Sequence, residues 1–362
     1  YLDEDNEGVR SRVRVVTPIT APDEVAALLA GAGTVLAFQP TDDDAIPDGF
    51  TGVLVATSGS TGVPKTVLLS RAALVAAADS VHERLGGPGA WANPLPVHYV
   101  AGLMTLVRAL VAGEPFCPLT PHLDDLRAAR GRTYLSLVPP HLHRALSEPE
   151  TLAKLATYDA ILVGGTALDP GLRARAEAAH LRLVETYGAS ETAGGVVYDG
   201  VPLPGVDVRL DPTGRIELAP PGLFDGYLGD PAATADVRRG RWFRTSDRGY
   251  LVDGRLHVTG RVDDVVQSGG VNVDLAAIQR LLDTEWPSET ACFAVPDPVW
   301  GATVLVASAG PGRAAVQARL AGLESAARPR GFLAVGTLPR LASGKIDRAD
   351  LAKRWEADGD RS

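Results

Sequence analysis

The chain has 362 residues, 45% hydrophobic and 22% charged, which is the composition of a globular protein rather than a disordered one. A domain usually takes about 100–200 residues, so this length predicts two or three compact units. The formal net charge of -9 argues against nucleic acid or an anionic membrane surface as the main partner.

Cysteine usage and the first residues bear on the cellular compartment. Cys117 and Cys292 each lie in apolar sequence, which predicts two buried thiols and neither a disulfide framework nor a zinc site. The opening YLDEDNEGVR has no basic-then-apolar signal, and no run reaches the roughly 18 apolar residues of a membrane span. We therefore expect a cytoplasmic protein without membrane insertion.

The first half of the chain alternates short β-branched runs with Ala/Leu-rich segments, the pattern of parallel sheets covered by helices. One predicted helix has Ser70 as its N-cap and Gly86 just past its end. The predicted strands cover 34–38, 53–56, 133–138 and 160–163, and the predicted helices cover 70–85, 100–112 and 170–180.

From about Val196 the sequence changes to short strands and tight turns, with Pro-Thr-Gly within 206–218 and Asp-Gly within 250–258. This stretch predicts a small antiparallel β unit. After residue 264 come a predicted helix (274–286), strands (292–295 and 303–307) and another helix (314–324).

These patterns predict an α/β protein. Residues 1–260 should form a large N-terminal domain of helix-covered sheets plus the small antiparallel β unit. Residues 261–362 have their own helices and strands, so they should form a small α+β C-terminal domain.

Residues 57–65 read TSGSTGVPK, a loop of small and hydroxylated residues that follows a predicted strand and precedes a predicted helix. Backbone N–H groups in such a loop can converge on an anion, so it predicts phosphate binding, with an ordinary surface turn as the alternative. The Walker pattern fails because its second glycine would fall on Pro64, which argues against a kinase or GTPase.

Four further segments carry candidate chemistry, although each residue alone could be an ordinary surface group. Glu191, in ETYGASET, offers the hard oxygen that Mg²⁺ prefers near phosphates, and Tyr187 offers a flat face to a purine. Asp247, at the end of a predicted strand, is a candidate acceptor for ribose hydroxyls. GRVDD (260–264) marks the domain junction, and Lys345 follows a glycine turn near the C-terminus.

Taken together and in order, TSGSTGVPK, YGASET, TSD, GRVDD and SGK resemble the adenylate-forming superfamily of acyl-CoA ligases, carrier-loading adenylation domains and luciferases. The resemblance runs from about Val53 to the C-terminus. The segment LPVHYVAGLMTLVR, residues 95–108, is most similar to the o-succinylbenzoate:CoA ligases of menaquinone biosynthesis, short actinobacterial type.

This resemblance implies ATP and coenzyme A as co-substrates, Mg²⁺ as the metal, a small carboxylic acid as the substrate and a mobile C-terminal domain. It also implies a role for each matching residue. Lys345 is the expected catalytic residue, Glu191 is the expected metal ligand and Asp263 is the expected hinge. The residues expected to bind the ATP phosphates are Thr57, Ser58, Gly59, Ser60, Thr61, Gly62 and Lys65, and those expected to bind adenine and ribose are Gly164, Gly165, Thr166, Tyr187, Asp247 and Arg261. The acid is expected to contact His98, Tyr99, Arg108, Gly188 and Ser190, and the CoA channel is expected to pass Gly269 and Gly270.

Arg108 is informative on physical grounds as well. It lies within the apolar run 100–112, where a guanidinium group is costly unless it meets an anion. A bidentate pair with the second carboxylate of o-succinylbenzoate would supply that anion. The alternative is that the side chain extends along its aliphatic stem to the surface.

The sequence departs from the family pattern in four places. Val271 stands where many relatives have the acid of GGEN, and Ser246 stands where TSD usually has glycine. The usual histidine position is occupied by Tyr99, so His98 and Tyr99 could exchange roles. Much of the N-terminal subdomain is missing, which leaves the substrate channel more open or completed by a second subunit in a homodimer.

Two alternative functions remain open. The first is adenylation of another aryl or alkyl acid, with transfer to CoA or to a carrier protein, because such enzymes share the ATP motifs. The second is a non-catalytic relative that binds a nucleotide or an acid. The joint presence of Lys65, Glu191, Asp247, Arg261 and Lys345 argues against the second, because a sensor needs no lysine on a mobile domain.

Overall fold

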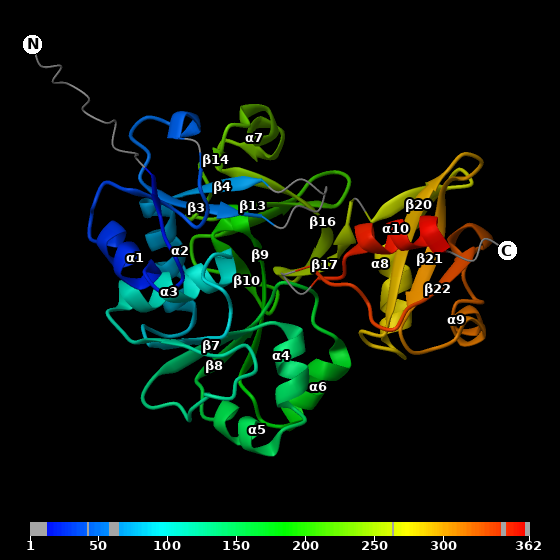
Figure 1. Ribbon diagram of the computed structural model, residues 1–362, viewed down its shortest axis with the longest axis horizontal. Coiled ribbons are helices and arrows are strands. Elements are labelled where there is room, and N and C mark those ends of the chain that lie inside the picture. Colours follow the sequence, from blue (N-terminus) through cyan, green and yellow to red (C-terminus); the bar gives the residue numbers. More distant parts are fainter. Residues whose placement is uncertain (1–12, 42, 58–64, 263, 342–344, 359–362) are drawn as a thin grey trace, which may run out of the picture.

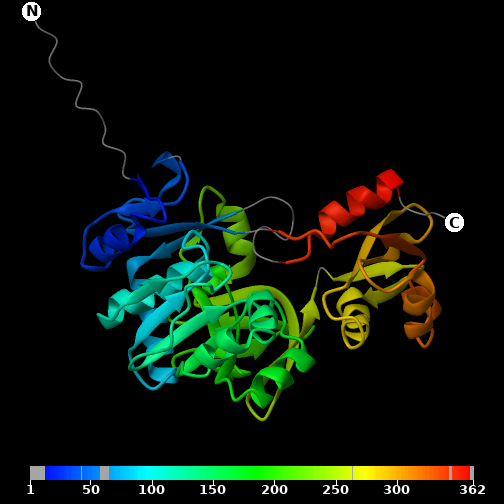
Figure 2. The same ribbon diagram turned by 60° about the horizontal axis from the view of Figure 1, so that its bottom comes forward.

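The computed structural model describes residues 13–41, 43–57, 65–262, 264–341 and 345–358. The chain forms a larger body that contains three sheets and a smaller body that contains the fourth (Figures 1 and 2). Six predicted site residues lie outside the described part: Ser58, Gly59, Ser60, Thr61, Gly62 and Asp263. The division of the chain at residues 260 and 261 stays a prediction.

The first sheet has five strands in the order β1-β2-β3-β4-β14. Its first three strands are parallel, and β3 and β4 form an antiparallel pair on either side of the predicted phosphate loop. The strands are β1 (Val13–Val15), β2 (Val35–Ala37), β3 (Gly52–Ala56), β4 (Thr66–Ser70) and β14 (Gly226–Tyr227), with α1 (Ala21–Leu29) between β1 and β2 and a 3-10 turn at Asp43–Ala45.

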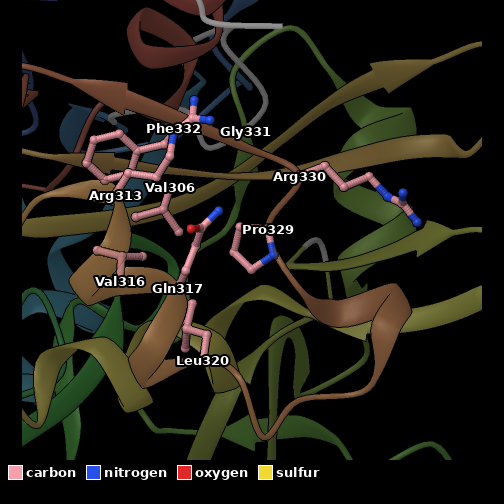
Figure 3. A pocket seen from close by; sticks show the side chains of 9 residues that line it. All are labelled: Val306, Arg313, Val316, Gln317, Leu320, Pro329, Arg330, Gly331 and Phe332. Atoms are coloured by element: carbon pink, nitrogen blue, oxygen red, sulfur yellow. The ribbon is translucent and has the colours of Figure 1, made fainter. Parts of the chain in front are cut away.

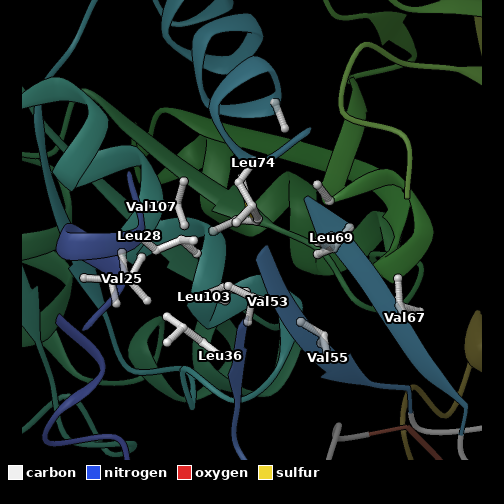
Figure 4. Packing of buried hydrophobic residues seen from close by; sticks show 14 of the residues in the cluster. Val25, Leu28, Leu36, Val53, Val55, Val67, Leu69, Leu74, Leu103 and Val107 are labelled. Atoms are coloured by element: carbon white, nitrogen blue, oxygen red, sulfur yellow. The ribbon is translucent and has the colours of Figure 1, made fainter. Parts of the chain in front are cut away.

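Helices α2 (Arg71–Arg84) and α3 (Val100–Ala112) pack beside this sheet. Ser70 caps α2, because its hydroxyl accepts a hydrogen bond from the Ala73 amide as the N-cap prediction requires. Fully buried residues from α1, α2, α3 and the strands form one core, in which Leu28, Leu69 and Leu103 are in view (Figure 4). Burial of such side chains contributes about 1.5–3 kcal/mol each to folding.

The second sheet has seven strands in the order β11-β10-β9-β8-β7-β5-β6. Strands β5 to β9 are parallel, as the alternating pattern predicts, whereas β10 and β11 add antiparallel strands at one edge. The strands are β5 (Ala90–Asn93), β6 (Phe116–Pro118), β7 (Thr133–Leu137), β8 (Ala160–Val163), β9 (Leu183–Ala189), β10 (Gly194–Tyr198) and β11 (Val201–Pro202); the accompanying helices are α4 (Pro139–Ala145), α5 (Pro149–Leu155), α6 (Pro170–Ala178) and the 3-10 turn Ser190–Thr192.

The third sheet is the antiparallel unit predicted from the tight turns. The Asp-Gly turn has positive φ at both Asp253 (49°) and Gly254 (74°), which suits a two-residue hairpin. The order is β12-β13-β16-β15, with β17 paired to β16. These elements are β12 (Asp207–Leu210), β13 (Arg215–Ala219), β15 (Arg238–Arg239), β16 (Trp242–Val252), β17 (Arg255–Arg261) and α7 (Pro231–Val237).

The smaller body is built on the fourth sheet, in the order β19-β18-β21-β20 with β22 paired to β21. Its helices cover the sheet and bury an apolar core around Leu282, Cys292 and Val306. The elements are β18 (Val265–Ser268), β19 (Val271–Asp274), α8 (Leu275–Asp283), β20 (Thr290–Asp297), β21 (Gly301–Ser308), α9 (Arg313–Arg319), the 3-10 turn Ser325–Ala327, β22 (Gly331–Ala334) and α10 (Arg348–Asp358).

Several sequence-based expectations need correction. Cys292 is buried as predicted, but Cys117 is exposed, because β6 is the edge strand of the seven-stranded sheet. The helix predicted over 314–324 ends at Arg319. The helix predicted over 274–286 begins at Leu275, with Asp274 as its N-cap, and ends at Asp283. Within the described residues, no helix has the length and apolar character needed to cross a bilayer.

Candidate active site

The predicted phosphate loop leaves and re-enters the first sheet between β3 and β4. The Thr57 amide donates to the Lys65 carbonyl (2.8 Å), and the Lys65 amide donates to the Thr57 hydroxyl (3.2 Å), so these two residues close the neck of the loop. The loop was expected to precede a helix, but it leads into β4, and α2 begins only at Arg71. Strand β4 therefore separates Lys65 from the N-terminus of α2.

Lys65, Glu191 and Tyr227 meet beside that neck. The Lys65 ammonium lies over the Tyr227 ring, 4.6 Å from its centroid, and the Tyr227 hydroxyl donates a 2.7 Å hydrogen bond to Glu191 Oε1. Antiparallel pairing of β14 with β4 sets Tyr227 opposite Val67, two residues after Lys65. Tyr227 was not among the predicted site residues, because its neighbours here are distant in sequence.

Tyr187, Asp247 and Arg261 form a second group. The Tyr187 hydroxyl donates to Asp247 Oδ2 (2.7 Å), and Asp247 Oδ1 lies 3.6 Å from the Arg261 guanidinium. Burial and then the charge of Asp247 raise the pKa of Tyr187, which keeps its phenol protonated as a donor. Asp247 was expected at a strand end; it lies within β16, paired with Arg261 on β17, because the bulge after Arg248 leaves the strand continuous.

Lys345 reaches this group from the smaller body. Its side chain is exposed, yet surrounding protein lowers its pKa, first by partial loss of hydration and second through the charge of Arg261. Asp247 and Glu191 oppose that shift, so both carboxylates lie within electrostatic range of the lysine. The structure thus gathers a lysine, an arginine and two carboxylates from separate parts of the chain.

Gly164, Gly165 and Thr166 follow the carboxyl end of β8, next to β9 in the parallel sheet. Ligands bind to open α/β sheets at this end of their strands. A Cβ on Gly164 would overlap the Thr186 hydroxyl, and Gly165 has φ +88°, a conformation that favours glycine. Gly165 and Thr166 are exposed, as a surface that accepts a flat base requires.

His98 faces a cavity of about 240 Å³ at the carboxyl ends of β2 and β3. Ala56 and Thr66, which flank the phosphate-loop segment, line the same cavity, and Phe38 meets His98 edge-on at 6.4 Å between ring centroids. The Tyr99 ring lies 4.3 Å from the His98 ring, and Tyr99 is the N-cap residue of α3. The structure therefore places His98 in the same cavity as Ala56 and Thr66, with Tyr99 against its ring.

Arg108 lies deeper, on the third turn of α3, and does not line that cavity. It is 4% exposed, which contradicts the alternative that its side chain extends to the surface. Its guanidinium lies 5.1 Å from the centre of the Trp91 ring, and its terminal nitrogen faces Gly194. Among the described residues its Nε has no hydrogen-bond partner, so a buried cationic donor remains available.

The environment of Arg108 includes His82 and Tyr198, which sequence reasoning missed. Burial and then the charge of Arg108 lower the pKa of His82, and the same arginine opposes the rise in the pKa of Tyr198 that burial causes. Within the described part of the chain, His82 Nε2, Trp91 Nε1 and the Tyr198 hydroxyl also lack hydrogen-bond partners. No sequence signal could identify this group, because α2, β5, α3 and β10 meet only in the folded state.

Gly188 and Ser190 lie where β9 ends. A Cβ on Gly188 would overlap the Gly194 carbonyl, so glycine permits β9 and β10 to pair closely here. Ser190 opens the 3-10 turn that carries Glu191. These two predicted acid-site residues thus lie between Gly194, which Arg108 faces, and Glu191.

Gly269 and Gly270 form the exposed turn between β18 and β19, with φ values of +60° and +80°. A Cβ on Gly269 would lie 2.7 Å from the Trp300 ring, which is stacked in turn on Arg330 at 3.7 Å. The turn therefore belongs to the fourth sheet, on the smaller body, whereas Asp247 belongs to the third sheet, on the larger body.

A small 20 Å³ hollow in the smaller body lies between α9 and the strands β21 and β22. Val306, Val316 and Leu320 form its apolar wall, and the Arg330 side chain points away from them (Figure 3). This hollow contains none of the predicted site residues and has room for about one water molecule.

The Glu191 carboxylate fits a magnesium ion that is also bound by the phosphates of a nucleotide. Among the described residues, no three His, Cys, Asp or Glu side chains gather into a metal cage. Mg²⁺ commonly binds through one or two carboxylates and the phosphates of its substrate rather than through such a cage. Glu191, with one oxygen held by Tyr227, is suited to that arrangement.

The chain is similar in sequence and in fold to known proteins. The family model described as "AMP-binding enzyme" matches residues 6–227. A Mycobacterium tuberculosis (strain H37Rv) protein named "Probable 2-succinylbenzoate--CoA ligase" is 36% identical over 364 residues, which is 95% of this chain and 92% of the relative.

Two solved structures are similar in fold. ATP-bound MatB from Rhodopseudomonas palustris is 26% identical with a TM-score of 0.74, and the match covers 84% of this chain and 68% of that one. The o-succinylbenzoate CoA synthetase (MenE) of Bacillus subtilis, in complex with the acyl-adenylate OSB-AMP, has a TM-score of 0.72 over 94% of this chain and 82% of that one. At 20% identity, the second likeness shows the fold alone.

Proposed function

Because this chain belongs to the AMP-binding enzyme family, we propose that it activates o-succinylbenzoate with ATP and transfers the acyl group to coenzyme A. The relative that covers nearly the whole chain carries the name of that activity. The observation that carries the proposal is the position of Lys345, which lies within electrostatic range of Asp247, Arg261 and Glu191 although it comes from the other body.

In the first step, a carboxylate oxygen of the acid attacks the α-phosphorus of ATP, forming the acyl-adenylate as pyrophosphate leaves. Lys65 and the rest of the loop meet the leaving phosphates, and Asp247, held by Tyr187, accepts from the ribose hydroxyls. Lys345 lies between the carboxylate and the α-phosphate, where negative charge gathers. Such chemistry depends mainly on positioning and charge neutralisation.

Glu191 is the proposed magnesium ligand, and the metal would supply additional neutralisation of the phosphate charge. Adenine would lie between Tyr187 and the Gly164–Thr166 segment, in which Gly165 and Thr166 are exposed. Arg108 would pair with the second carboxylate of the acid, which would give its buried guanidinium an anionic partner. His98 and Tyr99 would enclose the acid from the loop side.

In the second step, the thiol of CoA gives up its proton, its sulfur attacks the acyl carbonyl, and AMP leaves. We propose that the smaller body turns about Asp263 between the steps, which withdraws Lys345 and brings Gly269 and Gly270 to the channel. ATP and CoA are soluble cytoplasmic metabolites, so we place the reaction in the cytoplasm. A homodimer stays a prediction.

The test is pyrophosphate release with Mg²⁺-ATP across o-succinylbenzoate, benzoate, salicylate and medium-chain fatty acids. Each acid is assayed with and without CoA, and the products are identified by mass. We expect selective conversion of o-succinylbenzoate to its CoA thioester. Turnover of another acid would contradict the substrate, adenylate that accumulates despite CoA would contradict the acceptor, and no release with any acid would contradict catalysis.

Lys345→Ala should separate the two half-reactions. Loss of a contact that stabilises transition-state charge costs about 10²–10³ in rate, and adenylation should fall by that factor. Conversion of supplied acyl-adenylate to thioester should continue at the wild-type rate, because that step withdraws the lysine. Rapid-quench assays of each half-reaction measure the split, with the exposed Lys353→Ala as control. Equal loss of both half-reactions would contradict this assignment.

A further inference from the structure

Tyr227 contacts both Lys65 and Glu191, the two charged residues that we propose act on the triphosphate of ATP. Residues 225–228, which include Tyr227, are held at both ends by backbone hydrogen bonds. The Asp225 amide donates to the Leu68 carbonyl, and the Leu228 amide donates to the Thr66 carbonyl, each at 2.8 Å. These bonds attach the segment to β4 directly after Lys65. Tyr227 is 8% exposed, and its ring packs on the Phe224 ring at 5.1 Å between centroids.

Glu191 is attached to the same segment twice. Its backbone carbonyl accepts from the Phe224 amide (2.8 Å), and its carboxylate accepts from the Tyr227 hydroxyl (2.7 Å). Two hydrogen bonds therefore tie the 3-10 turn that carries Glu191 to Phe224 and Tyr227. A carboxylate held through both its backbone and its side chain loses little conformational entropy when a ligand binds.

Lys65 contacts a different part of the ring. Its ammonium faces the π surface, where the ring quadrupole attracts a cation, whereas the carboxylate lies at the hydroxyl end. One aromatic ring thus holds a cation and an anion at separate places.

We infer that Tyr227 is a positioning residue: its hydroxyl fixes Glu191 for a divalent cation, and its ring face seats Lys65 for the phosphates of the same nucleotide. This inference rests on the proposed function, because it takes the roles of Lys65 and Glu191 from it. Residues that orient a metal ligand typically change metal affinity by about 10–100-fold when they are lost.

Tyr227→Phe removes the hydroxyl and keeps the ring. Calorimetric titration of ATP binding at a series of Mg²⁺ concentrations should show about a tenfold or greater increase in the Mg²⁺ needed for half-maximal enhancement of ATP affinity. ATP affinity without Mg²⁺ should be unchanged, because the ring face under Lys65 remains. Tyr250→Phe is the matched control, since that tyrosine is exposed on β16 and stacks on His257.

Tyr227→Leu removes the ring as well, and it should also weaken ATP binding measured without Mg²⁺ by several-fold. Thermal melting checks that each variant is folded, and the phenylalanine variant carries the test alone if the leucine variant does not fold. In enzyme assays, Tyr227→Phe should slow adenylation at low Mg²⁺ and recover at high Mg²⁺. Thioester formation from supplied acyl-adenylate should keep the wild-type rate.

An unchanged Mg²⁺ dependence of ATP binding in Tyr227→Phe would overturn the inference. Equal loss of both half-reactions at every Mg²⁺ concentration would also overturn it, because that result indicates a general structural role. The binding measurement uses neither acid nor CoA. If wild-type protein turns over no acid but Tyr227→Phe still shifts the Mg²⁺ dependence, the proposed function fails and the role of Tyr227 stands.

Discussion

At the scale of single residues, the burial of Arg108 is the structural basis for its proposed pairing with a carboxylate of the substrate. Arg108 is 4% exposed, and its Nε has no hydrogen-bond partner among the described residues. Burying its charge is costly unless an anion pairs with it. The Trp91 face stabilises the cation in part, but an aromatic ring offers no acceptor for the N–H groups. An acid with a second carboxylate would supply that acceptor.

Arg108→Ala should raise the KM for o-succinylbenzoate roughly tenfold to hundredfold, because hydrogen bonds to charged groups contribute about 1.5–3 kcal/mol. The KM for ATP should hardly change. Steady-state kinetics with each substrate varied in turn measure both values. Arg108→Lys is the companion variant, which keeps the charge and loses the bidentate, stacking group.

An unchanged KM for the acid in Arg108→Ala would contradict the proposed role of Arg108. If the KM for the acid is unchanged while the thermal midpoint falls, Arg108 serves only to fill the space between Trp91 and Gly194. The assignment of a dicarboxylic acid would then lose its main structural support.

At the scale of elements, the active-site strand β9 depends on close approach to β10. Gly188 faces Gly195 across the pair, and a Cβ on Gly188 would overlap the Gly194 carbonyl. Backbone atoms in a paired strand cannot retreat as a flexible side chain can. The sequence resemblance assigned Gly188 to acid binding; the structure adds a requirement of the sheet itself.

Gly188→Ala should lower the free energy of unfolding by about 1–3 kcal/mol, the usual cost of overpacking. Urea denaturation followed by circular dichroism measures this change. Gly322→Ala is the control, since a Cβ there meets nothing within 4 Å. If the two variants were equally stable, the strands would have to accommodate a methyl group by separating, and the close pairing would not be required.

At the scale of the whole molecule, the approach of the two bodies determines which residues share a site. Gly260 lies where β17 ends, and a Cβ there would lie 2.8 Å from the Cβ of Ala276 on α8 of the smaller body. Arg348 on α10 also donates to Asp264 (3.4 Å), just beyond the junction. The contact between β17 and α8 therefore favours glycine at position 260, where φ is +153° and a Cβ would have no room.

Gly260→Ala should slow adenylation roughly tenfold, because overpacking costs about 1–3 kcal/mol in the arrangement that places Lys345. Thioester formation from supplied acyl-adenylate should change less, since it uses another arrangement. Rates of the two half-reactions measure the difference, and the control is Gly336→Ala on the smaller body, where a Cβ meets nothing within 4 Å. Equal slowing of both half-reactions would show that the contact serves both arrangements.

The sequence by itself determined the elements whose signals are local. Ser70 caps α2 through its own hydroxyl, and positive φ at Asp253 and Gly254 suits their hairpin, because capping and turn conformation depend on neighbouring residues. The order of five short motifs likewise sufficed to identify the family. The position of Asp247 within β16 was mispredicted, because a bulge lets the strand continue past it.

Only the tertiary structure decided which side chains meet. The burial of Arg108 against Trp91, the exposure of Cys117 on an edge strand and the contact of Tyr227 with Lys65 and Glu191 each join elements far apart in the chain. Hydrophobic periodicity and turn residues predict each helix, strand or turn separately. They do not predict which element packs beside it in a sheet or across the two bodies. The packing of sheets and helices supplies that information, because it fixes burial and distance together.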